Sequence, residues 1–269
     1  MSKLRRIHAL PIPAIDRAKV TGTKPRLLWI APTSLLVDEI YQRDLSKRSM
    51  QLIRKMVSEF AWNRLKPPIV VAAGRNEFHI VDGQHTAIAA ATLEIPEIPV
   101  FVVEAEKIDE RARAFVGHNT DRIVVSPIDI FRALLGAGDP DAVDVDNVCK
   151  RAGVRIRTMN QGSLVAEGDT MAIGMIRRLV AKRGVVKARQ VLECLVKAKR
   201  APISAAEISA VEQIICGTDR APSLETVVAA IRIEGTAGIA AAFAKAKRDR
   251  EPAWRCLLAR YAKHLDAAA

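Results

Sequence analysis

A glycine joint between a strand-like apolar run and an alanine-rich helical run holds the residues of this sequence most suited to chemistry. It reads Val81-Asp82-Gly83-Gln84-His85-Thr86. A glycine at such a joint lets backbone N–H groups approach an anion closely, and the N-terminus of the following helix favours negative charge. The joint therefore predicts a phosphate site. The alternative is an ordinary helix start that Asp82 caps. Asp82 is also a candidate metal ligand.

The elements around this joint alternate between strands and helices. We expect strands over 27–30, 69–73, 77–81 and 98–103, and helices over 46–60, 86–93 and 107–119. Residues 1–25 contain three prolines and little periodicity, which predicts a loosely ordered arm. We therefore expect a small mixed α+β domain over 26–125.

From Ser126 onward the sequence contains the residues that typically begin and end helices. Ser126-Pro127 is a capping serine followed by a proline at the first helical position. Helices are expected over 127–136, 141–152, 169–183, 185–199, 204–216, 223–233 and 236–264, the last with breaks. The region 126–269 is therefore predicted to be mostly α-helical and basic. Its stretch 127–165 has the form of a degenerate or remodelled helix-turn-helix, because no clean helical period follows Gly153.

The composition indicates a cytoplasmic globular protein. The chain has 269 residues with 49% hydrophobic content, enough for one large domain or two modest ones. No apolar run approaches the roughly 20 residues of a membrane span, and we expect no membrane partner. The four cysteines are far apart, which predicts reduced thiols and neither a disulfide nor a metal site.

The positive charge of the chain is concentrated in one stretch. The formal net charge is +12, and residues 150–200 hold 13 basic and 3 acidic residues. Such a concentration is typical of a surface that binds a polyanion, although solvated helix faces are the simpler alternative. The candidate phosphate contacts to DNA are Arg151, Arg155, Arg157, Arg177, Arg178, Lys182 and Arg183.

Three short motifs, in order, resemble the ParB/sulfiredoxin-like fold family, specifically its ParB-type N-terminal domain, over about residues 27–135. The first is the run Val37 to Arg43, which contains Gln42-Arg43. The second is Pro68-Ile69-Val70-Val71 followed by the glycine joint, in a Gly-Gln-His form of the family's loop. The third is His118-Asn119-Thr120-Asp121-Arg122, followed by Ser126-Pro127.

This resemblance implies a nucleotide site. Members of the family bind a nucleoside triphosphate, often CTP, beside the glycine loop and use it to control clamping on DNA. CTP or ATP with Mg²⁺ is therefore the implied cofactor, and a homodimer is an implied assembly. The residues implied to bind the nucleotide are Gln42, Arg43, Asp82, Gly83, Gln84, His85, Thr86, Asn119 and Arg122.

The sequence departs from the family pattern at several of these positions. Thr86 stands where the family's loop usually ends in arginine, which removes a principal phosphate-binding charge. His118 and Asp121 replace the glutamate and glutamine of the third motif, and Asp121 repels phosphate unless a metal bridges them. Gln84 stands at the position of sulfiredoxin's cysteine, which argues against sulfinic-acid reduction.

Three functions follow from these patterns. The first is a ParB-like DNA-binding protein with a nucleotide site. The second is an enzyme on the same site, a nuclease or weak triphosphatase, for which few carboxylates are at hand and no catalytic residue can be named. The third is a non-catalytic interaction module with a decayed nucleotide site.

Overall fold

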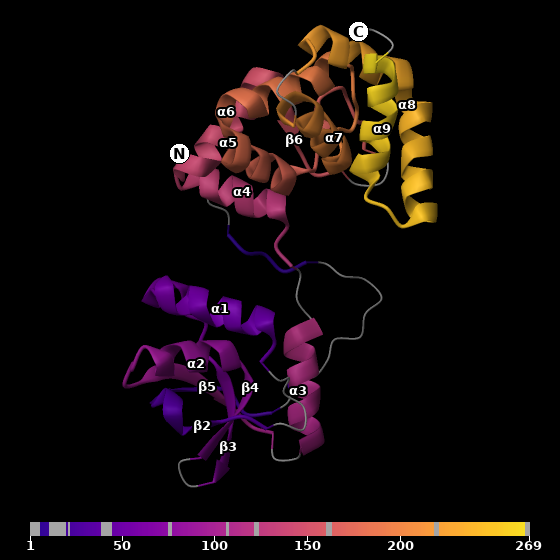
Figure 1. Cartoon of the computed structure of the whole chain (residues 1–269). Helices are drawn as coiled ribbons and strands as arrows, with labels where there is room; N and C mark the ends of the chain where they lie inside the picture. The colour runs from indigo at the N-terminus through magenta and orange to yellow at the C-terminus, as the bar shows by residue number, and fades with distance from the viewer. Residues whose placement is uncertain are drawn as a thin grey trace. The chain divides into compact units, whose positions relative to one another are not determined.

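The computed structural model divides into two compact units, Met1–Ile123 and Val124–Ala269. It describes residues 6–10, 20, 22–38, 45–74, 77–105, 108–120, 124–159, 163–217 and 221–266. Figure 1 shows a sheet flanked by helices in the first unit, and a mostly helical second unit that contains the short strand β6. The predicted α+β class with a helical C-terminal region is confirmed.

Unit 1 is built on a mixed five-stranded sheet. Its strands are β1 (Arg26–Ile30), β2 (Leu35–Leu36), β3 (Ile69–Gly74), β4 (Glu77–Asp82) and β5 (Ile98–Val103). The order across the sheet is β1-β5-β3-β4-β2. The β1/β5 and β3/β4 pairs are antiparallel, and the β3/β5 and β2/β4 pairs are parallel. The four longer strands match the expected ranges to within one residue.

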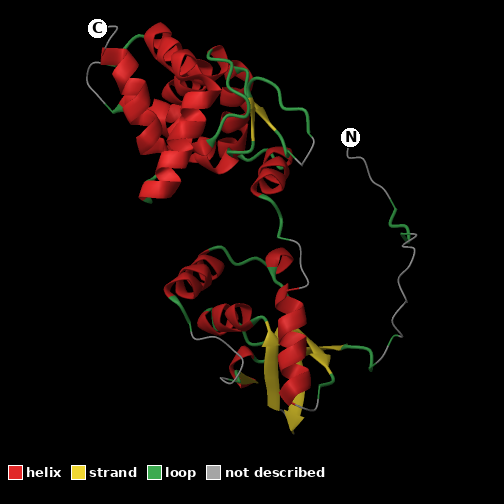
Figure 2. Ribbon diagram, turned by 90° about the vertical axis from the view of Figure 1, so that its right-hand side faces the viewer, coloured by secondary structure: helices red, strands yellow, loops and turns green. Residues whose placement is uncertain are grey.

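Helices cover both faces of this sheet (Figure 2). Side chains that alternate along β5, such as Ile98 and Val100, are buried on the face shared with α2 (Gln84–Thr92). The helix α1 (Lys47–Ser58) contacts α2 in turn. On the opposite face, Val71 and Val81 pack with Phe115 of α3 (Ile108–Thr120).

Two tryptophans of unit 1 lie on the surface. Trp29 on β1 is 56% exposed and Trp62 is 55% exposed, and their rings meet edge to face with centroids 6.1 Å apart. Alternation along β1 accounts for the exposure of Trp29, because Leu28 and Ile30 face the core and Trp29 faces the other side.

Unit 2 contains six helices within its described residues. They are α4 (Pro127–Gly136), α5 (Pro140–Ala152), α6 (Ile173–Lys197), α7 (Ala205–Cys216), α8 (Leu224–Asp249) and α9 (Ala253–Asp266). Side chains of Ser126, Asp139, Ser204 and Ser223 cap the starts of four of them by accepting backbone N–H groups. One apolar core joins all six helices.

Two glycines break the long helices where the sequence predicted separate ones. Gly184 in α6 has φ 72° and Gly235 in α8 has φ 55°, in the left-handed region that glycine adopts without strain. By length and composition α8 could cross a membrane. However, its backbone turns at Gly235, and Val227, Ile231 and Ala242 are buried in the core of unit 2.

The segment after α5 differs from a simple helix-turn-helix. Gly153 ends α5 with φ 75°, and the chain then forms β6 (Arg155–Ile156), which pairs in parallel with β7 (Asp169–Thr170). The next helix, α6, starts at Ile173 rather than at residue 169. The expected helix start is wrong because Asp169 and Thr170 form the strand β7 and are not part of the helix.

A buried carboxylate holds this segment together. The Asp169 side chain is fully buried, and its Oδ1 accepts from Arg155 Nε at 2.8 Å. Its Oδ2 accepts from Arg157 at 3.2 Å and from the Ala166 N–H at 2.9 Å. Burial by itself raises the pKa of Asp169, but these hydrogen bonds and charges outweigh it, and the pKa lies below its ordinary value of 3.8.

Two more buried carboxylates of unit 2 are held in the same way. Glu212 pairs with Lys182 and Arg183, and Glu234 pairs with Arg260 and His264. In both glutamates burial raises the pKa, and hydrogen bonds from the cationic partners lower it further than burial raises it.

We expect unit 2 to lose stability in acid. Carboxylates with lowered pKa values stabilise the fold fully above their unfolded pKa values of about 4, and this contribution is lost as the pH falls through the lower folded values. The free energy of unfolding, measured by urea titration with far-UV circular dichroism, should be level from about pH 7 to 5 and fall below about pH 4. Asp169→Asn should be less stable at neutral pH by about 2–3 kcal/mol and should fall less steeply in acid. Equal slopes for the two proteins would contradict the role of Asp169.

Candidate functional site

The glycine joint lies between β4 and α2, as the sequence predicted. Gly83 precedes α2 in the left-handed conformation, with φ 99° and ψ 17°. A Cβ at this position would lie 2.8 Å from the Pro68 Cα. The fold itself therefore requires glycine here, both for its conformation and for its close approach to Pro68.

The start of α2 offers backbone donors to an anion. The first intrahelical hydrogen bond runs from the Ala87 N–H to the Gly83 carbonyl oxygen. The N–H groups of Gln84, His85 and Thr86 precede it and have no intrahelical acceptor, as at every helix start. No side chain caps this helix. These three groups and the helix dipole favour an anion at this point.

The Asp82 side chain competes with such an anion. Its Oδ1 accepts the Gly83 N–H at 2.9 Å, so the donor closest to the glycine turn is already engaged. Asp82, Gln84 and His85 are half-buried, whereas Thr86 is only 7% exposed. His85 is therefore better placed than Thr86 to reach a ligand.

The other residues implied by the family resemblance are only partly covered. Gln42, Arg43, Asp121 and Arg122 lie outside the described residues, and Asn119 lies in α3 with its side chain outside them. Of the residues that the resemblance implies for the nucleotide site, the described structure therefore shows only those of the joint together, Asp82 to Thr86. Within the described part of the chain, no cluster of three or more His, Cys, Asp or Glu side chains could hold a metal ion.

His79 has a structural partner. Its Nδ1 lies 3.1 Å from a terminal nitrogen of Arg111, whose Nε donates to the Ala105 carbonyl oxygen. A guanidinium group only donates, so His79 Nδ1 is the acceptor and its proton is on Nε2. The contact ties α3 to β4.

The structure divides the basic segment 150–200 into two sets of cations. Arg155, Arg157, Lys182 and Arg183 are paired with the buried Asp169 and Glu212. Further pairs join Lys150 to Asp146, Arg189 to Glu193, Lys199 to Glu167 and Arg200 to Glu207. A carboxylate therefore offsets part of the charge of each of these residues.

The second set has no acidic partner within the described residues. Arg151 is exposed on α5, and Arg177 and Arg178 are exposed on the first turns of α6. Arg178 donates to the Met175 sulfur at 3.4 Å. Lys187 and Lys197, farther along α6, share this property. Of the seven predicted DNA contacts, Arg151, Arg177 and Arg178 are thus the ones with uncommitted charge.

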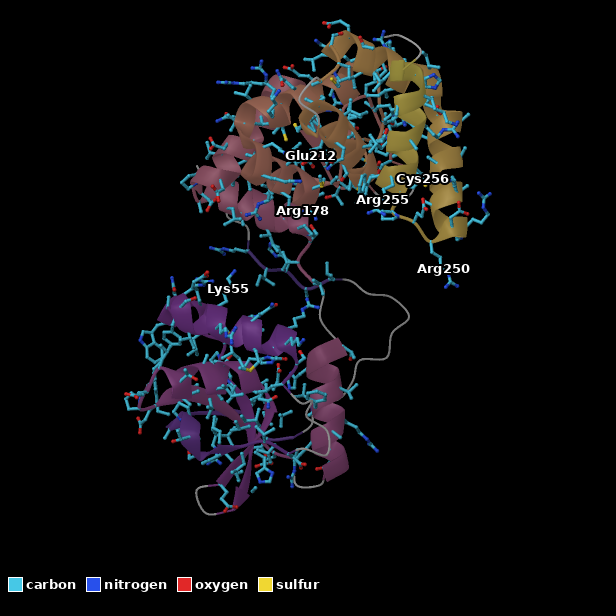
Figure 3. All side chains as sticks on the ribbon, viewed as in Figure 1. Lys55, Arg178, Glu212, Arg250, Arg255 and Cys256 are labelled. Carbon is cyan, nitrogen blue, oxygen red and sulfur yellow. The ribbon has the colours of Figure 1, made fainter. Side chains whose placement is uncertain are left out.

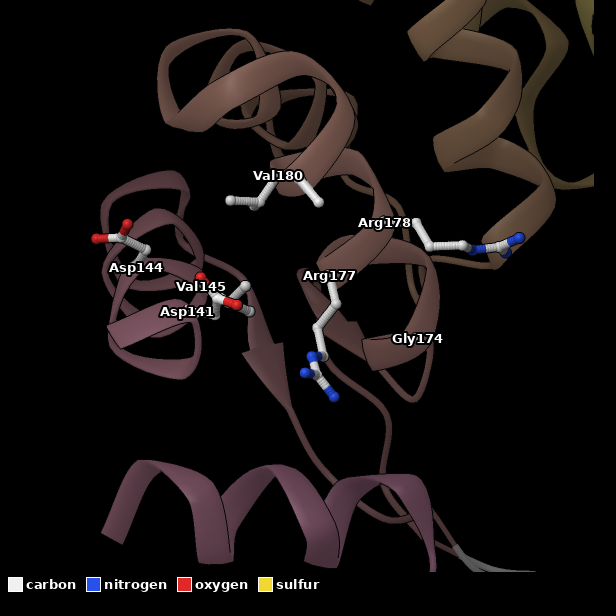
Figure 4. Close-up of a pocket in the computed structure, with 8 residues that line it drawn as sticks. Asp141, Asp144, Val145, Gly174, Arg177, Arg178 and Val180 are labelled. Carbon is white, nitrogen blue, oxygen red and sulfur yellow. The ribbon is translucent and has the colours of Figure 1, made fainter. Parts of the chain in front are cut away.

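A hollow of about 370 Å³ is lined by residues of α5 and of the start of α6. It is lined by Asp141 and Asp144 of α5 and by Gly174, Arg177 and Arg178 of α6. In Figure 4 the two arginine side chains extend from α6 in different directions, and Asp144 lies on the α5 side. The carboxylates disfavour phosphate on the α5 side, which leaves α6 as the cationic side.

Sequence spacing could have revealed part of this pairing. Lys150 with Asp146 and Arg189 with Glu193 are four residues apart on a helix, which is the spacing of an ion pair. The pairing of Glu212 with Arg183 joins different helices, and no local pattern predicts it.

No family model and no curated protein matches this sequence. The chain is similar to the C-terminally truncated chromosome-partitioning protein ParB from Caulobacter crescentus complexed with CTP-γ-S, with 13% identity, a TM-score of 0.36, and 84% of this chain and 99% of that one covered. For the same protein complexed to the centromeric parS site the identity is 15% and the TM-score is 0.29, with 69% of this chain and 97% of that one covered. For protein Atu1540 from Agrobacterium tumefaciens the identity is 15% and the TM-score is 0.26, with 63% of this chain and 91% of that one covered. ParB is also the protein that the sequence motifs resemble, but at these scores the similarities carry no functional argument.

We expect Gly83→Ala to destabilise unit 1 by about 1–3 kcal/mol, because the new Cβ meets Pro68 and the residue must hold a positive φ. Urea unfolding of the full chain measures this. Gly136→Ala is the matched control: a Cβ there meets nothing within 4 Å, and alanine should be neutral or slightly stabilising in α4. Equal effects of the two substitutions would contradict the structural role of Gly83.

Proposed function

We propose that this chain is a ParB-like DNA-binding protein of the cytoplasm. Its helical unit contacts DNA phosphates through the first turns of α6, and the start of α2 is its nucleoside-triphosphate site. The observation that carries the proposal is the exposure of Arg177 and Arg178 on α6 without an acidic partner in the described chain.

The helix pair α5 and α6 supports a remodelled helix-turn-helix. The two helices pack against each other, and α6 is the next helix after α5. In a helix-turn-helix the second helix enters the major groove with its first residues near the bases. Here that helix carries two free arginines in its first turns, whereas Asp141 and Asp144 occupy the start of α5. Arginine contacts to phosphate would position the protein without reading sequence.

The start of α2 supports a nucleotide site within limits set by Asp82. Free N–H groups and the helix dipole favour phosphate, and the resemblance of the three motifs to the family implies a nucleotide site beside this loop. The Asp82 carboxylate repels phosphate at the same point. A triphosphate therefore requires a divalent cation or a turn of the Asp82 side chain away from Gly83. CTP or ATP with Mg²⁺ is the proposed ligand, and a homodimer is the proposed assembly.

The double variant Arg177→Gln/Arg178→Gln should bind short duplex DNA more weakly. The slope of log Kobs against log salt falls by about 0.9 for each lost phosphate contact, so we expect it to fall by about 2. Fluorescence anisotropy between about 50 and 200 mM salt measures both quantities.

The matched control is Lys150→Gln/Arg189→Gln, which removes the same charge from residues that are already ion-paired. We expect its salt slope to stay within experimental error of the wild type. Equal slopes for all three proteins, or no DNA binding by the wild type, would overturn the DNA-binding proposal.

Nucleotide binding should raise the melting temperature of the wild type in the presence of Mg²⁺. Ligand at 100-fold excess over its Kd adds about 2.7 kcal/mol to the stability of the folded state. His85→Ala should reduce the shift, because it removes a half-buried donor at the site. Asp82→Asn should increase binding without Mg²⁺, because it removes the competing charge.

A screen of the four ribonucleoside triphosphates, each with and without Mg²⁺, tests this by differential scanning fluorimetry. No shift with any nucleotide would refute the nucleotide site and leave the chain as a DNA-binding module with a decayed site. A shift that is equal in wild type, His85→Ala and Asp82→Asn would place the nucleotide elsewhere.

A further inference from the structure

A second group of cations lies at the junction of α8 and α9, far in sequence from the basic segment 150–200. It consists of Lys245, Lys247, Arg248, Arg250 and Arg255. All five are exposed. Figure 3 labels Arg250 and Arg255 at this end of the two helices. The net charge of residues 201–269 does not reveal this cluster, because the acidic residues of that region, Asp249 and Glu251 among them, offset it.

One carboxylate neutralises only part of this cluster. Asp249 accepts from Arg248 at 2.8 Å and lies 3.7 Å from Lys245. Lys247, Arg250 and Arg255 have no acidic partner within the described part of unit 2. Three uncommitted cations therefore face solvent within nine residues of chain.

The helix dipole explains some of these charges but not all of them. Cations in the last turn of α8 and just after it interact favourably with the negative end of the helix, which accounts for Lys247 and Arg250. Arg255 lies in the first turn of α9, where a cation is unfavourable, and that turn has no acidic residue. The position of Arg255 thus needs another explanation.

Aromatic rings accompany these cations. The Arg255 guanidinium lies over the Trp254 ring, 5.4 Å from its centroid. This stacking orients the guanidinium and leaves its N–H edge free to donate to phosphate oxygens. Phe243, one helical turn before Lys247, is 40% exposed. Arginine on an aromatic ring beside further cations is typical of surfaces that bind nucleic acid.

We propose that Lys247, Arg250 and Arg255 form a second DNA-phosphate contact surface, separate from the one on α6. The inference rests on the proposed DNA-binding function and extends its footprint to the α8–α9 junction. A lipid surface is the less favoured source of phosphate groups, because Ile239, Ala242 and Ala246 of this helix end are buried. Within the described residues 236–256, Phe243 is the one large apolar side chain that is exposed.

The test is the triple variant Lys247→Gln/Arg250→Gln/Arg255→Gln of the full chain. We expect the slope of log Kobs against log salt for duplex DNA to fall by about 3, with at least about a tenfold loss of affinity at 100 mM salt. The matched control is Lys150→Gln/Arg189→Gln/Lys199→Gln, which removes the same charge from ion-paired residues outside the cluster and should leave the slope unchanged.

A direct signal comes from Trp254, the one tryptophan of unit 2. In a Trp29→Phe/Trp62→Phe background, the binding of DNA should change the fluorescence of Trp254. The triple substitution should abolish that change at protein and DNA concentrations where binding through α6 persists.

The outcomes separate this inference from the proposed function. If Arg177→Gln/Arg178→Gln lowers the salt slope and the triple variant does not, DNA binding stands and the second surface is refuted. If the wild type does not bind DNA, both proposals fail. If the triple variant binds DNA normally but no longer binds vesicles of anionic phospholipid, the surface is a membrane contact and the inference is overturned.

Discussion

The buried carboxylate of Asp169 is the constraint on which the arrangement of the helical unit depends. Its oxygens accept from Arg155, Arg157 and the Ala166 N–H, which are spread over the excursion between α5 and α6. A buried charge must be paired and hydrogen-bonded, so the three donors are fixed in place with it. The paired strands β6 and β7 form as a result, and α6 begins only after them.

The same requirement divides the cations of the chain into two kinds. Carboxylates that are buried, such as Asp169 and Glu212, take the nearest guanidinium or ammonium groups as partners. Those cations support the fold, and their charge is not free for a ligand. Other cations have no carboxylate partner within the described residues, among them Arg177 and Arg178 on α6 and Arg255 on α9, and their charge is available to neutralise phosphate. Net charge by itself overstates the binding surface.

The glycine joint shows a similar overlap of roles. Gly83 is required by its positive φ and by the close approach of Pro68, so its presence is explained without a ligand. The N–H groups at the start of α2 still favour an anion, with Asp82 as the competing charge. Thr86, which the family resemblance implies as a nucleotide contact, is only 7% exposed, so the half-buried His85 is the more reachable side chain.

The sequence by itself determined the elements and the α+β class. Apolar periodicity, capping residues such as Ser126 and Ser204, and helix-breaking glycines such as Gly184 act over a few residues, so they can be read locally. Tertiary structure alone decided which charges are free, because the partner of Arg183 is 29 residues away on another helix. It also decided that Trp29 faces outward, since the sequence gives the alternation of β1 but not which face the helices cover.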